Sequence, residues 1–92
     1  MYMILVYDIS QNNDGKKVLP KVFKTCKKYL SHVQHSVFEG EITVGQKMKL
    51  EKELKNHIRK DIDSVIVFTS RNEKWLGKEF WASTVDLTSA FL

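Results

Sequence analysis

The first ten residues, MYMILVYDIS, constrain the fold more than any other segment of the chain. On a strand, apolar side chains occupy both alternating faces: Tyr2, Ile4 and Val6 on one, and Met3, Leu5, Tyr7 and Ile9 on the other. Such strands are typical of the middle of a sheet that is covered on both sides. The segment ends near Asp8, whose carboxylate is costly to bury unless it is paired, hydrogen-bonded or bound to a cation.

The size and charge of the chain limit its class. The 92 residues are enough for one small domain, and a core of that size is thin, so association between chains is expected. The formal net charge of +4 favours a polyanionic partner, although many mildly basic soluble proteins carry the same charge. The single cysteine, Cys26, excludes an internal disulfide and a cysteine-based zinc site.

No targeting or membrane segment is expected. The sequence runs from Met1 directly into the first strand, without the ordered regions of a secretory signal. No apolar run approaches the roughly 20 residues that span a bilayer. We therefore expect a cytoplasmic protein with no membrane partner.

A lysine stripe marks the first predicted helix, from about Lys17 to residue 30, in which Pro20 fits if it lies in the first turn. Apolar residues, including Cys26, gather on one side of this helix. The stripe on the opposite side consists of Lys17, Lys21, Lys24 and Lys28. A solvated face is the usual interpretation. A stripe without a balancing acid also suits duplex phosphates, and Arg71 would extend that surface.

The rest of the chain predicts strands at residues 33–42 and 64–70, a second helix between them, and a possible strand at 74–81. Thr43 and Gln46 form a capping box that begins the second helix, which we expect to run to about residue 59. The simplest architecture is a ferredoxin-like βαββαβ sandwich, α+β in class, with a four-stranded antiparallel sheet and two helices on one face. A second subunit, related by a two-fold axis, would cover the other face as a homodimer.

We divide the chain into a ferredoxin-like domain, residues 1–83, and a C-terminal tail, residues 84–92. The tail sequence, TVDLTSAFL, alternates like a short strand and ends in two apolar residues. Such a tail is either docked or disordered. We expect it to dock on the sheet edge of the partner subunit.

Two histidines and one further acid are weaker candidates. His32 and His35 have a spacing that is weak for a metal site, and we interpret them as structural or surface residues. Asp14, in the polar loop after the first strand, fits a turn or a helix cap.

Three segments, VYDIS at the first strand, QHSVFEGE at the second and SVIVFTS at the third, resemble the small CRISPR-associated endonuclease family Cas2. A strand that ends in aspartate is common, so the combination carries the resemblance, which covers roughly residues 2–70. It implies a homodimer that works in CRISPR spacer acquisition and cleaves phosphodiester bonds of RNA or double-stranded DNA with a metal ion. Alternatives are a non-catalytic, DNA-binding scaffold of the integrase complex and a toxin-like ribonuclease of the same fold.

The resemblance also assigns roles to individual residues. It makes Asp8 the catalytic residue and metal ligand, with Ser10 and Phe38 as supporting residues of the two motifs. Many relatives have arginines at the entrance to the first helix, where this chain has Lys16 and Lys17. Lysine supplies charge but loses the bidentate recognition of phosphate.

One carboxylate per chain is too few to hold Mg²⁺ with protein ligands alone, although Mg²⁺ keeps several waters. A two-fold axis near the strand end would bring two copies of Asp8 together to share one Mg²⁺ or Mn²⁺ ion. That ion would polarise a phosphoryl oxygen or activate water. The alternative is a structural Asp8 that is protonated or hydrogen-bonded.

Overall fold

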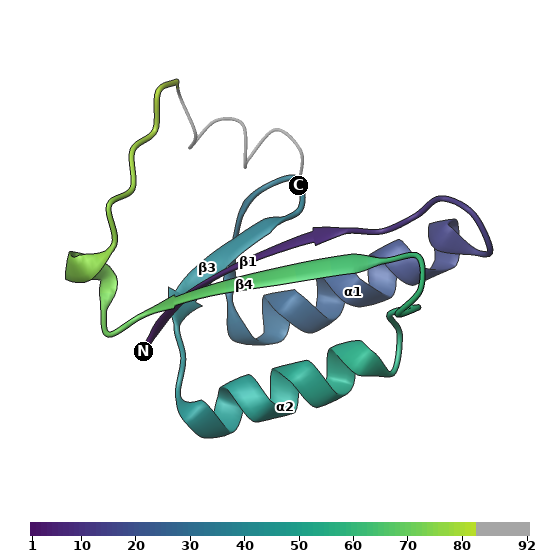
Figure 1. Cartoon of the computed structure of the whole chain (residues 1–92), viewed down its shortest axis with the longest axis horizontal. Coiled ribbons are helices and arrows are strands. Elements are labelled where there is room, and N and C mark those ends of the chain that lie inside the picture. Colours follow the sequence, from purple (N-terminus) through teal and green to yellow (C-terminus); the bar gives the residue numbers. More distant parts are fainter. Residues whose placement is uncertain (83–92) are drawn as a thin grey trace.

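The computed structural model describes residues 1–82, and the predicted tail, residues 84–92, lies outside the described residues. The elements are β1 (Tyr2–Asp8), α1 (Gly15–Tyr29), β2 (Ser31–Gln34), β3 (Val37–Glu41), α2 (Val44–Lys55) and β4 (Ser64–Ser70). The strands form an antiparallel sheet in the order β2-β3-β1-β4, and both helices lie on one side of it (Figure 1). The ferredoxin-like βαββαβ sandwich is confirmed.

The fourth strand comes from a hairpin that the sequence analysis missed. The predicted strand at residues 33–42 is in fact two strands, β2 and β3, separated by a turn at His35 and Ser36. His35 has a φ of 40°, a left-handed conformation that lets the chain reverse there. The predicted strand at residues 74–81 is wrong: this segment contains the 3₁₀ turn η1 (Glu73–Trp75) and then irregular chain.

Helix α2 begins at the predicted capping box. Thr43 Oγ1 accepts a hydrogen bond from the Gln46 backbone N–H at 3.1 Å, and the Gln46 side chain accepts one from the Thr43 N–H at 3.0 Å. The helix ends at Lys55, earlier than predicted, and Ile58 packs against the core from the turns that follow. Neither helix in residues 1–82 has the length and apolar character needed to cross a bilayer.

Helix α1 begins two residues before the predicted start. Asp14 is its N-cap residue, in a left-handed conformation and without a side-chain bond to the helix. The regular helix therefore begins at Gly15, and Pro20 lies beyond the first turn. At that position the proline has no backbone N–H, so the Lys16 carbonyl does not receive the helical hydrogen bond that another residue would donate.

The core lies between the sheet and the helices. Strand β1 is central, between β3 and β4, as predicted. The β1 residues and Ile9 that face the helices are at most 6 % exposed, and they pack against buried residues of α1 and α2. The principal members are Met3, Leu5, Tyr7, Ile9, Val22, Cys26, Leu50 and Leu54. Cys26 is thus a core residue, as expected.

The face of the sheet opposite the helices is mostly uncovered within residues 1–82. Ile4 and Val6 of β1 pair with Phe68 and Ile66 of β4, and these two β4 residues are 55 % and 52 % exposed. We call these four residues the open-face patch. Within one chain, β1 is therefore covered on the helix side and largely open on the other side, as predicted, and the covering of the patch by a second subunit stays a prediction.

The segment after β4 covers one end of that open face. It rises on the side of the sheet away from the helices (Figure 1). Lys78 Nζ donates to both carboxylate oxygens of Glu39 at 2.7 and 2.8 Å, and it lies 5.9 Å from the centroid of the Tyr2 ring. Tyr2 is consequently buried, whereas Asp8, at the other end of β1, is exposed.

Candidate functional site at the end of β1

Asp8 is the last residue of β1 and belongs to the open face of the sheet. It continues the alternation of Ile4 and Val6, and its cross-strand partner on β4 is Ser64. Its side chain is exposed. Among the ion pairs of residues 1–82, none involves Asp8. No charged group in this part of the chain pairs with the carboxylate, so it is open to solvent and accessible to a cation.

Residues 1–82 of one chain supply only part of the ligands that a bound cation needs. Residues 1–82 contain no cluster of three or more histidine, cysteine, aspartate or glutamate side chains that could hold a metal ion. A free carboxylate oxygen is nevertheless the type of ligand that Mg²⁺ accepts, and Mg²⁺ retains several waters. Asp8 therefore fits a largely hydrated Mg²⁺ that is completed by a second acidic group from another molecule.

Ser10 shapes the loop that follows Asp8. Its hydroxyl oxygen accepts a hydrogen bond from the Asn12 backbone N–H at 3.2 Å. Its own backbone N–H donates to Asp63 Oδ1 at 2.9 Å. Between Asp8 and Ser10, Ile9 is buried in the core. Ser10 thus sets the path of the chain out of the strand.

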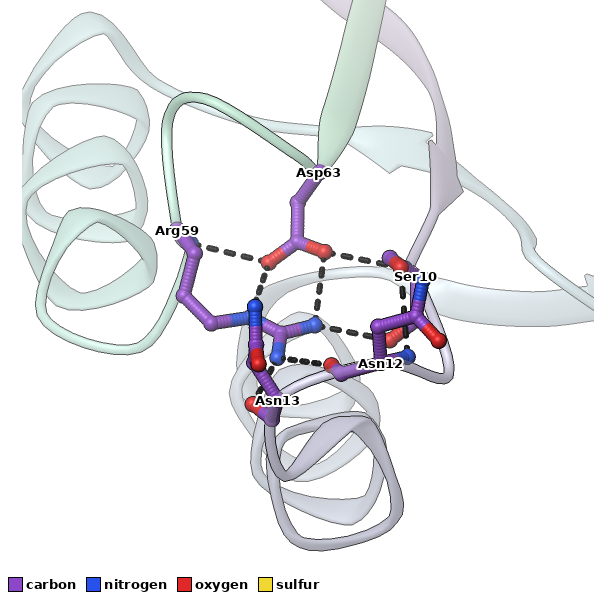
Figure 2. Close-up of polar contacts among 5 residues, drawn as sticks. All are labelled: Ser10, Asn12, Asn13, Arg59 and Asp63. Carbon is purple, nitrogen blue, oxygen red and sulfur yellow. Dashed lines mark hydrogen bonds and ion pairs between the residues drawn. The ribbon is translucent and has the colours of Figure 1, made fainter.

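Two residues that the sequence analysis did not single out, Arg59 and Asp63, hold this loop (Figure 2). They come from the turns between α2 and β4, and the Asp63 side chain is completely buried. Their hydrogen bonds, above all those from the Arg59 side chain, lower the pKa of Asp63 from 3.8 to about 2. The sequence offered one signal for this pair: an arginine and an aspartate spaced i, i+4 just before a predicted strand, a spacing that allows an ion pair within one helical turn.

Phe38 lies in the core and not in the site. It is 0 % exposed, and its ring centroid is 6.1 Å from that of Tyr7 and 5.4 Å from that of Phe23. The expected supporting role of Phe38 is therefore corrected to packing beneath β1, because a buried ring cannot touch a substrate. His32 packs against the rings of Phe23 and Phe38, and its Nε2 lies 2.8 Å from the His35 carbonyl oxygen.

The lysines of α1 divide into two groups. Lys17, Lys21 and Lys24 are exposed and form no ion pair within residues 1–82. Lys28, by contrast, pairs with Glu53 of α2. This hydrogen bond raises the pKa of Lys28 and lowers that of Glu53. The expectation of a stripe without any balancing acid is therefore wrong at Lys28, since the acid comes from the other helix.

The fold brings some predicted residues together and separates others. Lys16 and Lys17 begin α1 directly after the loop that follows Asp8. Arg71, in contrast, follows the last residue of β4, which pairs with Tyr2 at the far end of β1. At about 3.4 Å per residue, that end is about 20 Å from Asp8. Arg71 does not belong to the site around Asp8.

Comparisons with known proteins agree with this fold. A family model described as "CRISPR associated protein Cas2" matches residues 1–77. The Fusobacterium nucleatum protein named CRISPR-associated endoribonuclease Cas2 is 46 % identical over 92 residues, which is 100 % of this chain and 87 % of that protein. A Moorella thermoacetica protein named CRISPR-associated endoribonuclease Cas2 2 is 48 % identical over 91 residues, which is 98 % of this chain and 100 % of that protein. The crystal structure of Streptococcus pyogenes Cas2 superimposes with a TM-score of 0.72 at 29 % identity, over 82 % of this chain and 90 % of that one.

Proposed function

The chain belongs to the Cas2 family of CRISPR-associated proteins, and on that premise we propose that it is a metal-dependent endonuclease of CRISPR spacer acquisition. It would hydrolyse phosphodiester bonds of RNA or double-stranded DNA. The observation that carries the proposal is the exposed carboxylate of Asp8 at the end of the central strand, which forms no ion pair within residues 1–82. The endoribonuclease names of the relatives support RNA as the substrate to test first.

The proposed active unit is a homodimer that forms through the open-face patch. Ile66 and Phe68 are more than half exposed, and burying such apolar surface favours association. Asp8 shares this face with the patch. A two-fold axis passing near the end of β1 would place two copies of Asp8 close together.

In this dimer, the two copies of Asp8 would hold one Mg²⁺ or Mn²⁺ ion, and without it the two carboxylates would repel each other. The ion would supply Lewis-acid polarisation of a phosphoryl oxygen or an activated water. Lys16 and Lys17, exposed at the start of α1, would attract the neighbouring phosphates as point charges. The remaining charge for binding would come from Lys21 and Lys24.

A second candidate function is a DNA-binding scaffold of the integrase complex. The observation in its favour is the row of exposed lysines on α1, Lys17, Lys21 and Lys24, that have no acidic partner within residues 1–82. Such a row suits duplex phosphates and does not require the carboxylate of Asp8. The two functions are therefore separable by mutation.

The tail, residues 84–92, is proposed to dock on the partner subunit next to β4. Within residues 1–82, β4 is an edge strand, paired with β1 alone. Between β4 and α2 runs a groove lined by apolar side chains that include Leu54, Val65 and Val67. An added strand could place its alternate apolar side chains in this groove. Deletion of residues 84–92 should weaken the dimer, and an unchanged dimer would remove the tail from the proposal.

The test is cleavage of labelled RNA and labelled duplex DNA by the wild-type protein and by Asp8→Asn, each with Mg²⁺ or with EDTA. Asp61→Asn is the matched control, because Asp61 is exposed and lies in the turns before β4. We expect cleavage with Mg²⁺ by the wild type and the control only. Undiminished cleavage by Asp8→Asn would refute the catalytic role of Asp8. Binding without cleavage by all three proteins would favour the scaffold.

A further inference from the structure

The loop at residues 9–14 joins Asp8 to the first lysines of α1, and its conformation is not self-supporting. Asn13 and Asp14 have φ angles of 50° and 70°, in the left-handed region, which asparagine and aspartate tolerate better than other residues with a side chain. The Asp14 side chain forms no cap bond to the helix. Two successive residues in this conformation still carry a conformational cost that contacts from elsewhere in the chain can offset. The loop therefore depends on contacts from elsewhere in the chain.

Arg59 provides these contacts through all five of its guanidinium N–H groups (Figure 2). Nη1 donates to the carbonyl oxygen of Asn12 at 2.6 Å and also to that of Asn13. Nη2 donates to the Ser10 carbonyl at 2.7 Å and to Asp63 Oδ1 at 2.9 Å, and Nε donates to Asp63 Oδ2 at 2.9 Å. A lysine has three donors on one atom and cannot reproduce this fork.

Asp63 anchors the guanidinium to the sheet. Its side chain is 0 % exposed, and its two oxygens also accept the backbone N–H groups of Ser10 at 2.9 Å and Arg59 at 2.8 Å. The next residue, Ser64, is the cross-strand partner of Asp8. We call Arg59 and Asp63 together the loop clamp.

Gly15 closes the loop against the start of α1. A Cβ at this position would lie 1.9 Å from the Ser10 carbonyl oxygen, closer than any contact between these atoms allows. The same oxygen accepts the hydrogen bond from Arg59 Nη2. The end of β1, the loop and the first turn of α1 thus form one tightly packed unit.

We propose that Arg59 and Asp63 are positioning residues for the site around Asp8. Resting on the proposed function, this inference assigns the loop clamp the task of fixing the Asp8 carboxylate relative to Lys16 and Lys17. A carboxylate that holds an ion and an ammonium that holds a phosphate must keep a set separation for the reacting atoms to align. The clamp touches neither the substrate nor the ion.

The test compares Arg59→Lys and Asp63→Asn with the wild type in three measurements on the full-length dimer. They are amide hydrogen exchange of residues 10–15, affinity for Mn²⁺, and kcat and KM on the RNA or DNA that the wild type cleaves. Thr43→Ala is the control, because it removes the N-cap hydrogen bond of α2 and destabilises the fold away from the loop.

We expect faster exchange in the loop of both clamp variants and weaker Mn²⁺ binding. We also expect kcat to fall about 10- to 100-fold with KM little changed. The control should keep the wild-type loop exchange and kcat. Loop exchange and Mn²⁺ affinity equal to those of the wild type in both variants would overturn the inference, whether or not the protein cleaves nucleic acid. A kcat loss equal in Thr43→Ala and the clamp variants would also overturn it, since the effect would then be general destabilisation.

Discussion

The buried carboxylate of Asp63 makes a measurable contribution to stability that depends on pH. Its pKa is lowered from 3.8 to about 2, chiefly by the hydrogen bonds from the Arg59 side chain. The Asp63 side chain is 0 % exposed, but the Arg59 side chain that pairs with it is 21 % exposed, so solvent screens part of this interaction. A difference of that size corresponds to at most about 2 kcal/mol in the free energy of unfolding.

The pH range of this contribution follows from the two pKa values. The folded state binds the proton less readily than the unfolded state, so the stabilisation is complete well above pH 3.8 and is lost as the pH falls towards about 2. Asp63→Asn removes the titrating group and keeps the shape. It also leaves Arg59 N–H groups facing an amide, a cost of about 1–3 kcal/mol that does not change with pH.

Urea unfolding between pH 7 and pH 2 measures this difference, at one fixed protein concentration because the proposed active unit is a dimer. The wild type should lose about 2 kcal/mol more than Asp63→Asn over that range. Glu51→Gln is the control, because the ion pair between Glu51 and Lys55 is exposed on α2 and such pairs contribute about 0.5 kcal/mol or less. Equal pH dependence in the wild type and Asp63→Asn would refute the assignment of the buried ion pair.

Three further perturbations test other parts of the structure. Phe68→Glu places a charge in the open-face patch and should convert the dimer to monomers in sedimentation equilibrium, whereas an unchanged mass would place the dimer interface elsewhere. Replacing Lys17, Lys21 and Lys24 by Glu should abolish duplex binding. Replacing them by Gln should reduce the steepness of the plot of log affinity against log salt by about three for each α1 that contacts the duplex. A slope unchanged from that of the wild type and of the control Lys49→Gln would remove α1 from the interface. Gly15→Ala should destabilise the protein in thermal unfolding because its Cβ would meet the Ser10 carbonyl oxygen at 1.9 Å, whereas Gly77→Ala, with nothing within 4 Å, should be neutral; equal melting temperatures would contradict the tight packing of the loop.

The elements with local sequence signals were the ones that could be predicted. Strand β4 matches its predicted residues 64–70, and α2 begins at the capping box of Thr43 and Gln46. The hairpin between β2 and β3 was missed because its turn contains no glycine, proline or asparagine. His35 takes the left-handed conformation there, and residue types alone do not signal that choice.

Of the candidate site, the sequence predicted only the residues at the end of the first strand and in the segment directly after it. Asp8 was recognisable because it ends an apolar segment, whereas its exposure on the open face became clear only from the structure. The clamp was not recognisable, since Arg59 binds backbone carbonyls of residues that lie 46 to 49 positions earlier. Every residue has a backbone carbonyl, so the pattern of side chains in the sequence cannot show which carbonyls Arg59 binds. The partner of Lys28 was missed for a similar reason, because Glu53 comes from the other helix.

The central claim, that two copies of Asp8 share one ion, is tested most directly by the stoichiometry of Mn²⁺ binding. Titration of the wild-type dimer followed by electron paramagnetic resonance should show one bound Mn²⁺ for every two chains. Asp8→Asn should lose this binding, and the control Asp61→Asn should retain it. One ion per chain, or binding that survives in Asp8→Asn, would contradict the shared site.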